Sequence, residues 1–467
     1  AIIARYNQPL YVAVKTRQQV AAAGGEVTVD FYLINEKNVR GNHQLKISVT
    51  DSQGKVMEVG TYETEAAGGE VYGQLLVKDV KIPVPTAGGL CRIEAKLCKE
   101  NSVVTTGYDD ILSVNLASNM LDGKGAVWED GSALQNFLKG KTKEAVAAYE
   151  DNLGKLDWIM VARPPRKDQL TMVPMEALRS ADGKPGLDVV YYEDMEFQKE
   201  VYHEVAKVVN LSAIEGATPS PFVYMLDGYG IKWSGKVLPS VSGEYTIIPQ
   251  SNDRSMIEVF VNGKKIYEIT RKKEHLGDGK VYLEEGKSAD IEIRFRHPRS
   301  NARCRLDWAV PNDKMPDAQR LMERAVNDGT KIFIIQSADE WSEFIAANSK
   351  AVFKDKFFVG TNWLGGVMFN KPHDIFKELP VGNALNWPYQ ALIHTGVERM
   401  GLVMEGEELL VGAYHTYPMA IGTAMGIVPM GKGSVLFSTL DIYGNIINDS
   451  AAGLVAKKLI FNMIDFK

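Results

Sequence analysis

The order of strand-like and helix-like patterns is the feature that most limits how this chain can fold. Residues 9–116 contain only short β-rich runs, and a strand-helix alternation begins after residue 125. This alternation stops near residue 185, gives way to further β runs, and resumes at residue 317. Two separate half-sheets would each leave unburied faces, so we predict one α/β domain interrupted by an inserted β domain.

The first 116 residues have the pattern of half-buried antiparallel strands. Val27, Val29 and Phe31 alternate with other residues and so share one face of a strand. Turn-forming sequences, such as AGG at 23–25, separate the runs. About seven strands in about 110 residues predict an immunoglobulin-like β-sandwich. The predicted strands are residues 10–14, 27–34, 44–49, 55–59, 74–80, 89–97 and 110–114.

The α/β pattern predicts a doubly wound domain that is split in two. Before the interruption we predict strands at 126–128 and 158–161 and a helix at 132–149. After it, the pattern predicts helices at 317–328, 338–347 and 450–464 and strands at 331–335, 356–359 and 434–437. The apolar face of the last helix comprises Leu454, Val455, Leu459, Ile460 and Met463.

Charge and hydropathy exclude several classes of function. The 53 Lys and Arg residues against 59 Asp and Glu residues leave a net charge of −6, which favours neither nucleic acid nor an anionic membrane as partner. No apolar run reaches the roughly 18 to 20 residues of a membrane span. The chain begins at Ala1 without a basic leader, so we expect a processed product or a piece of a longer protein.

The inserted segment, residues 186–311, has the most specific sequence. It contains KWSGKVLPSVSGEYT at 232–246, SNDRS at 251–255 and EVFVNGKKI at 258–266. This segment resembles the protective-antigen-type β-sandwich of bacterial toxins, adhesins and glycosidases. Asn262-Gly263 predicts a two-residue hairpin turn with positive φ at both positions. Trp233 and Trp308 share the parity of apolar neighbours and are predicted to lie in the core.

The resemblance also implies a ligand site in one loop of the inserted segment. Sugar-binding members of that family use an acidic loop, sometimes through calcium, which corresponds here to Asn252 and Asp253. We therefore predict carbohydrate binding by Asn252, Asp253 and Arg254, with calcium on Asp253 as one option. Asn252 stands where the family pattern has a first aspartate. The alternative is an aspartate that only organises a turn.

Charged residues line the outer face of a predicted hairpin around residues 297–300. An acidic glycan or a neighbouring domain could bind there, but a solvated or interdomain charge ladder is the favoured interpretation. The residues are Arg294, Arg296, Arg303 and Arg305, opposed by Glu292 and Asp307.

The split domain resembles the class I glutamine amidotransferase-like fold, in the non-catalytic form used by β-galactosidases for trimerisation or support. GTKIFII at 329–335, HDIFKELP at 373–380, NWPY at 386–389 and GKGSVLFSTLD at 431–441 carry the resemblance. Amidotransferase chemistry needs a cysteine thiolate, but the three cysteines, Cys91, Cys98 and Cys304, lie outside this domain. His394 and His415 are therefore interpreted as structural.

The leading sandwich resembles the one that follows the catalytic barrel in large family 2 glycoside hydrolases of Bacteroidetes type. PLYVAVK at 9–15, VTVDFYLINEK at 27–37 and GEVYGQL at 69–75 carry this resemblance. The chain has no succession of eight β/α units, so the retaining two-glutamate machinery of such enzymes is missing. The predicted domains are 1–118, 186–311, and the split domain 119–185 with 312–467.

Three hypotheses follow for function. The first is the non-catalytic C-terminal region of a periplasmic or extracellular family 2 glycoside hydrolase, which braces the parent barrel and binds an oligo- or polysaccharide. The second is a purely structural module that forms a homo-oligomer and has no ligand. The third is a free-standing enzyme with an unrecognised site, built for instance from His394, His415 and nearby carboxylates such as Glu405 or Asp441. No cofactor is predicted apart from the calcium option.

Overall fold

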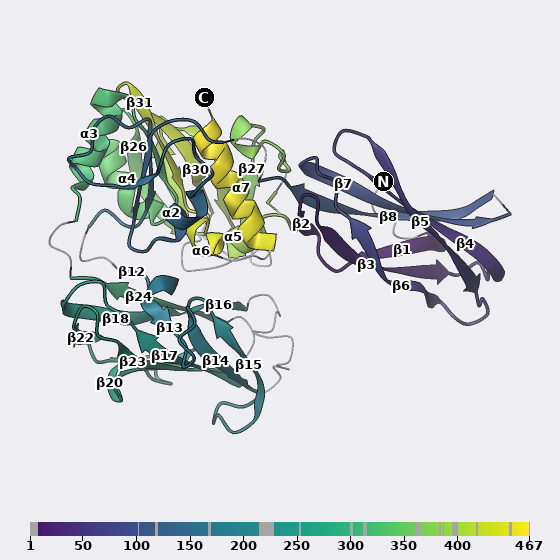
Figure 1. Ribbon diagram of the computed structural model, residues 1–467, viewed down its shortest axis with the longest axis horizontal. Helices are drawn as coiled ribbons and strands as arrows, with labels where there is room; N and C mark the ends of the chain where they lie inside the picture. The colour runs from purple at the N-terminus through teal and green to yellow at the C-terminus, as the bar shows by residue number, and fades with distance from the viewer. Residues whose placement is uncertain are drawn as a thin grey trace. The chain divides into compact units, whose positions relative to one another are not determined.

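The structure is a computed structural model of the chain, shown in Figure 1. The chain divides into two compact units. The first comprises Ala1–Asn119, Pro372–Tyr389 and Asn448–Lys467, and the second comprises Met120–Lys371 and Gln390–Ile447. The three-domain division stays a prediction. The described residues are 8–100, 102–116, 120–166, 170–213, 228–251, 254–298, 302–311, 315–359, 366–382, 384–385, 387–394, 400–416, 419–447 and 451–466.

Two sheets form a β-sandwich in the first unit. Their strand orders are β1-β3-β6 and β2-β8-β7-β4-β5. Val27, Val29 and Phe31 are each at most 1% exposed, which confirms the predicted alternation. All seven predicted strands are present, and the short strand β2 is added. The strands are β1 (Leu10–Thr16), β2 (Val20–Ala22), β3 (Glu26–Asn35), β4 (Gly41–Thr50), β5 (Val56–Ala66), β6 (Gly73–Pro83), β7 (Gly89–Lys99) and β8 (Ser102–Val114).

The first unit also contains the C-terminal helix α7 (Ala451–Asp465) and the short helix η3 (Asp374–Phe376). Val455, Leu459, Ile460 and Met463 are buried as predicted, whereas Leu454 is only half-buried. Lys458 is buried in the same helix, and its Nζ donates to Glu378 Oε2 at 2.6 Å and to the carbonyl oxygen of Asn115 at 3.2 Å. Among the described residues, no helix has the length and hydropathy needed to cross a membrane.

One part of the second unit is built on a mixed sheet (Figure 1). Its parallel part has the order β10-β9-β11-β25-β31, and antiparallel strands continue it through β30 and β28 to β26. Strand β29 pairs with β30 and β27. The strands are β9 (Gly125–Glu129), β10 (Ala147–Ala148), β11 (Trp158–Ala162), β25 (Lys331–Ile334), β26 (Val352–Phe358), β27 (Val367–Asn370), β28 (Met400–Glu405), β29 (Glu408–His415), β30 (Ala420–Met430) and β31 (Gly433–Ser438).

The helices that follow the insertion begin and end close to the predicted positions. The Asp317 side chain accepts hydrogen bonds from the N–H groups of Gln319 and Arg320, which caps α3. Gly329 ends this helix in the left-handed conformation, with φ of 78°. The helices of the second unit are α2 (Ala133–Leu138), α3 (Ala318–Asp328), α4 (Ala338–Ala347), α5 (Gln390–His394) and α6 (Tyr443–Ile446).

The predicted helix at 132–149 is wrong over most of its length. Helix α2 covers only Ala133–Leu138, and Gly140 then adopts a φ of 73°, which a helix does not allow. Ala147 and Ala148 instead pair in parallel with β9 as strand β10. The tertiary pairing with β9 therefore overrides the helix-forming tendency of the alanine-rich end of this segment.

A second β-sandwich lies between β11 and α3. One sheet has the order β12-β24-β18-β22 with β16 beside β24, and the other has the order β15-β14-β17-β23-β19-β20-β21 with β13 beside β17. The elements are β12 (Thr171–Met172), η1 (Met175–Ala177), β13 (Leu178–Arg179), β14 (Leu187–Tyr192), β15 (Glu200–Ala206), β16 (Asn210–Ala213), β17 (Tyr229–Val237), β18 (Gly243–Ser251), β19 (Met256–Val261), β20 (Lys264–Ile269), β21 (His275–Leu276), β22 (Lys280–Leu283), β23 (Ala289–His297) and β24 (Ala302–Ala309).

The core of this inserted sandwich contains the predicted tryptophans. Trp233 is 3% and Trp308 is 1% exposed, and the Trp308 ring lies 5.2 Å from that of Tyr245 between centroids. Asn262 and Gly263 have φ values of 49° and 74°, which confirms the predicted hairpin turn between β19 and β20. Strand β12 enters the sandwich as the neighbour of β24, with Thr171 opposite Trp308.

The prediction that a hairpin lies around residues 297–300 is wrong. Strand β23 pairs with β17 and β19, whereas β24 pairs with β12, β16 and β18, so the two strands belong to different sheets. The charge ladder is therefore split between two outer faces. Arg294 pairs with Glu292 and Arg296 with Glu258 on one sheet, and Arg305 pairs with Asp307 on the other. Inward-facing residues have the same parity in both arrangements, so the alternation alone could not separate them.

Candidate functional site

The predicted carbohydrate-binding loop connects β18 and β19, which lie in different sheets of the inserted sandwich. Asn252 and Asp253 lie outside the described residues. Arg254 is exposed and has a φ of 84°, a left-handed conformation that fits a sharp turn. No group of three or more His, Cys, Asp or Glu side chains with metal-binding geometry occurs among the described residues. The binding roles of Asn252, Asp253 and Arg254, and calcium on Asp253, stay predictions.

The end of this loop is anchored in the sandwich. Ser255 is 3% exposed, and its hydroxyl lies 3.2 Å from Nδ1 of His297. The His297 ring is itself buried and stacks on Phe295, with 6.0 Å between centroids and 8° between planes. Ser255, which follows Arg254, is therefore held against the end of β23.

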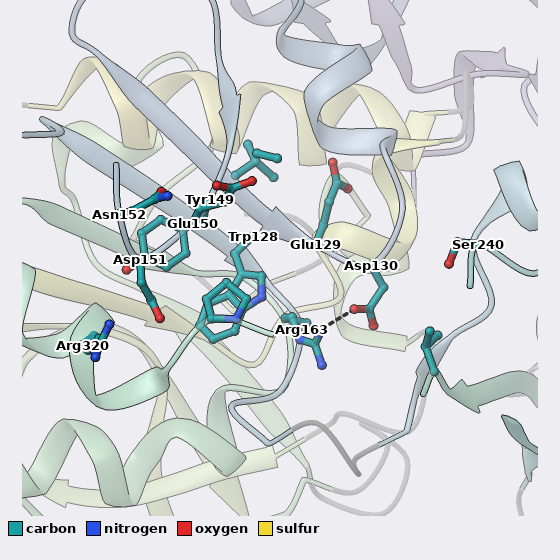
Figure 2. A pocket seen from close by; sticks show the side chains of 14 residues that line it. Trp128, Glu129, Asp130, Tyr149, Glu150, Asp151, Asn152, Arg163, Ser240 and Arg320 are labelled. Atoms are coloured by element: carbon teal, nitrogen blue, oxygen red, sulfur yellow. Dashed lines mark hydrogen bonds and ion pairs between the residues drawn. The ribbon is translucent and has the colours of Figure 1, made fainter. Parts of the chain in front are cut away.

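A pocket of about 710 Å³ lies elsewhere in the second unit (Figure 2). It opens at the carboxyl ends of the parallel strands β9, β10 and β11. Residues of the inserted sandwich and the start of α3 complete its wall. The lining residues are Val127, Trp128, Glu129, Asp130, Ala148, Tyr149, Glu150, Asp151, Asn152, Arg163, Ser240, Val310, Pro316 and Arg320.

A buried ion pair lies at the base of this pocket. Arg163 is 6% exposed, and its Nη1 pairs with Oδ1 of Asp130, as Figure 2 shows. Thr171 donates its hydroxyl hydrogen to the other carboxylate oxygen of Asp130. Burial lowers the pKa of Arg163, while the Asp130 carboxylate opposes that shift. A guanidinium keeps its charge under such conditions, so the pocket holds a fixed cation at Arg163.

Aromatic rings form the wall beside the ion pair. Trp128 lies 5.7 Å from Tyr149 and 5.6 Å from Trp341 between ring centroids. Trp341 is fully buried, and its Nε1 donates to the carbonyl oxygen of Arg163 at 2.8 Å. These contacts fix Trp128 and the backbone of Arg163 before any ligand arrives.

Glu129 is held on the inner side of the pocket by three hydrogen bonds. Its carboxylate accepts the N–H groups of Leu134 and Gln135, each at 3.0 Å, and the hydroxyl of Tyr443 at 2.8 Å. Burial nevertheless raises the pKa of Glu129 above its ordinary value of 4.5. Burial also raises the pKa of Tyr443, so its hydroxyl remains a donor.

The raised pKa of Glu129 leads to a prediction for stability. The folded chain binds the Glu129 proton more tightly than the unfolded chain does, so its stabilising contribution is present below pH 4.5 and is lost as the pH rises through the raised pKa. We expect the melting-temperature difference between wild type and Glu129→Gln to shift in favour of the variant from pH 4.5 to 8. Thermal unfolding of both proteins at each pH measures this difference. Glu150→Gln, which removes an exposed carboxylate on the pocket rim, is the charge control. A pH-independent difference would contradict it.

Both carboxylates named in the enzyme hypothesis have a partner in the structure. Glu405 is exposed at the end of β28 and pairs with Lys354. Asp441 accepts a hydrogen bond from the N–H of Gly444 at 3.1 Å. His415 is half-buried at the end of β29, and the side chain of His394 lies outside the description.

Sequence reasoning missed the pocket, although a signal existed. Glu129 and Asp130 follow one predicted strand and Arg163 follows the next, so polar residues end two strands of a predicted parallel sheet. Carboxyl ends of neighbouring parallel strands meet at one edge, where ligands bind in α/β sheets. The third strand end, that of β10, was not foreseen, because residues 147–148 were predicted to be helical.

Comparison with known proteins identifies the inserted sandwich. Residues 183–320 match the PA14 domain family. The anti-sigma-I factor RsgI3 of Acetivibrio thermocellus is 28% identical over 127 residues, which are 27% of this chain and 19% of the relative's length. The chain therefore spans about a fifth of that curated relative.

Solved structures show similarity at low sequence identity. A β-glucosidase from Kluyveromyces marxianus is 12% identical, with 47% of this chain and 27% of that chain covered and a TM-score of 0.29. A PA14 sugar-binding domain from an RTX adhesin is 13% identical, with 26% and 88% covered and a TM-score of 0.23. An anti-sigma factor domain-containing protein is 13% identical, with 66% and 90% covered and a TM-score of 0.24.

Proposed function

We propose that this chain binds carbohydrate through its inserted sandwich and has no hydrolytic activity of its own. The match of residues 183–320 to the PA14 family is the observation that carries the proposal. The same family name is given to a sugar-binding domain of an adhesin. In the proposal, the loop of Asn252, Asp253 and Arg254 provides carboxylate, amide and guanidinium groups for sugar hydroxyls, with calcium as an optional bridge.

The wider context is proposed on sequence resemblance. In this proposal the chain is the C-terminal part of a periplasmic or extracellular family 2 glycoside hydrolase. The leading sandwich is then immunoglobulin-like, and the split α/β domain is amidotransferase-like and braces the parent catalytic barrel. The motifs at residues 9–15 and 329–335 support these finer assignments. The alternative is a purely structural or oligomerising module without a ligand.

A glycan-array screen of the whole chain, with calcium and with a chelator, tests the proposal. We expect selective binding that Asp253→Ala weakens by about 10-fold or more, because a hydrogen bond to a charged group contributes roughly 1.5 to 3 kcal/mol. Asp278→Ala changes another exposed aspartate of the same sandwich and should leave binding unchanged.

The other outcomes separate the alternatives. Binding that survives Asp253→Ala would move the sugar site away from this loop. The absence of glycan binding together with a concentration-dependent mass would support the structural module. Hydrolysis of a glycan by the purified chain would revive the enzyme hypothesis.

A further inference from the structure

The pocket in Figure 2 lies where the connections of the parallel sheet reverse direction. Across the sheet, the five parallel strands lie in the order β10-β9-β11-β25-β31. The second strand of the chain therefore lies on one side of the first, and the third lies on its other side. The connection from β9 therefore leads to one side of β9, and the next connection leads back to β11 on its other side. Such a switch point leaves a crevice outside the carboxyl ends of the strands, where α/β proteins bind ligands.

All three strands at the switch point contribute to the pocket. Trp128, Glu129 and Asp130 end β9, Tyr149 begins the segment after β10, and Arg163 follows β11. Arg324 holds the segment after β10, because its guanidinium donates to the Tyr149 hydroxyl and to the carbonyl oxygens of residues 151, 153 and 154. The pocket rim is therefore built before a ligand binds.

The lining chemistry favours a neutral polyhydroxylated ligand. Arg163, Arg320 and the Ser240 hydroxyl are donors, and carboxylates and the Asn152 amide are acceptors, so adjacent sugar hydroxyls would find both kinds of partner. Four carboxyl groups against two guanidiniums give a formal charge of 2 − 4 = −2, which disfavours an anion. The two guanidiniums lie among these carboxyl groups, so a cation would meet positive as well as negative groups in the wall.

The size of the pocket and the placement of its exposed and buried groups agree with this class of ligand. A volume of about 710 Å³ lies in the range of small-molecule sites and leaves room for a short oligosaccharide. Arg320, Glu150 and Asn152 are exposed on the rim, whereas Arg163 and Trp128 are buried at the base. A ligand would therefore exchange rim water for contacts with groups that are already in position.

We propose that this pocket is a second binding site, which takes a neutral mono- or oligosaccharide. The Arg163–Asp130 pair engages two adjacent hydroxyls, and Arg320 and Asn152 contact the sugar from the rim. This site is separate from the loop of residues 251–255 and does not depend on the function proposed for that loop.

Calorimetric titration of the whole chain tests the site. The titrations use the Asp253→Ala background, in which the loop of the inserted sandwich is disabled. The probes are glucose, galactose, mannose, cellobiose and lactose, with glucuronate, inorganic phosphate and spermidine as charged comparisons. We expect a neutral sugar to bind, and Arg163→Lys to weaken it about 10-fold or more, because lysine lacks the forked donor geometry of arginine.

Rim variants keep the test independent of folding. Arg320→Ala and Asn152→Ala change exposed side chains and should weaken binding several-fold, whereas Glu323→Ala, on the same helix as Arg320 and outside the pocket lining, should not. The proposal is overturned if no neutral sugar binds at tens of millimolar, if the rim variants bind like Glu323→Ala, or if only phosphate, glucuronate or spermidine binds.

Discussion

Arg305→Ala should lower the free energy of unfolding of the inserted sandwich by about 3 to 5 kcal/mol. Asp307 is 1% exposed, and Arg305 holds both of its oxygens, with Nε to Oδ1 at 2.8 Å and Nη2 to Oδ2 at 2.9 Å. The variant leaves a buried carboxylate without its counter-charge. Hydrogen exchange of the β18 and β24 amides measures the loss locally, which suits a chain of several cooperative units.

Two further measurements identify the cause of this loss. Burial already raises the pKa of Asp307, and loss of Arg305 should raise it further, so the deficit of the variant should shrink as the pH falls and Asp307 is protonated. Lys280→Ala breaks an exposed pair with Glu244, with side chains 50% and 61% exposed, and should cost less than about 1 kcal/mol. Equal losses for both variants would show that burial of the pair is not the cause.

Trp341→Ala should destabilise the parallel sheet of the second unit by about 3 to 5 kcal/mol. The side chain is fully buried, its ring meets Trp128 edge-on, and its Nε1 holds the carbonyl of Arg163. Trp341→Phe keeps most of the buried area and loses the hydrogen bond, so about 1 to 3 kcal/mol is expected. Hydrogen exchange of β11 and β25 measures both.

The functional consequence of Trp341→Ala should follow from its contacts. Because the same side chain positions Trp128 and Arg163, saccharide binding in the pocket should weaken at temperatures where the variant is still folded. Phe358→Ala removes a ring that is 49% exposed and should change neither property by much. A folded Trp341→Ala variant with unchanged stability would contradict the packing argument.

The fold was predictable where local pattern and burial agree. Strands such as β3 have one buried face, so the alternation of Val27, Val29 and Phe31 is visible in the sequence. Helix α3 carries its own boundary signals, an aspartate at the start and a glycine at the end. These elements need no knowledge of distant residues.

The errors arose where distant residues decide the structure. Whether Ala147 belongs to a helix or a strand depends on its parallel partner Ala126, and the sheet to which β24 belongs depends on β12, β16 and β18. The pocket joins three strand ends with α3 and the inserted sandwich, so no single motif encodes it. The loop of Asn252 and Asp253 came from family resemblance alone and stays a prediction.

The pairing of β12 with β24 has a consequence for the chain entropy of the parallel sheet. The two strands are hydrogen-bonded neighbours, so the segment between β11 and α3 leaves and returns at nearly one place. For the sheet, a folded insertion is therefore equivalent to a closed loop made of residues 163–170 and 310–317, about 16 residues. An unfolded insertion of about 150 residues would raise the cost of closing that loop by about 2 kcal/mol. The pairing of β11 with β25 thus draws part of its stability from the inserted sandwich, none of whose described strands belongs to that sheet.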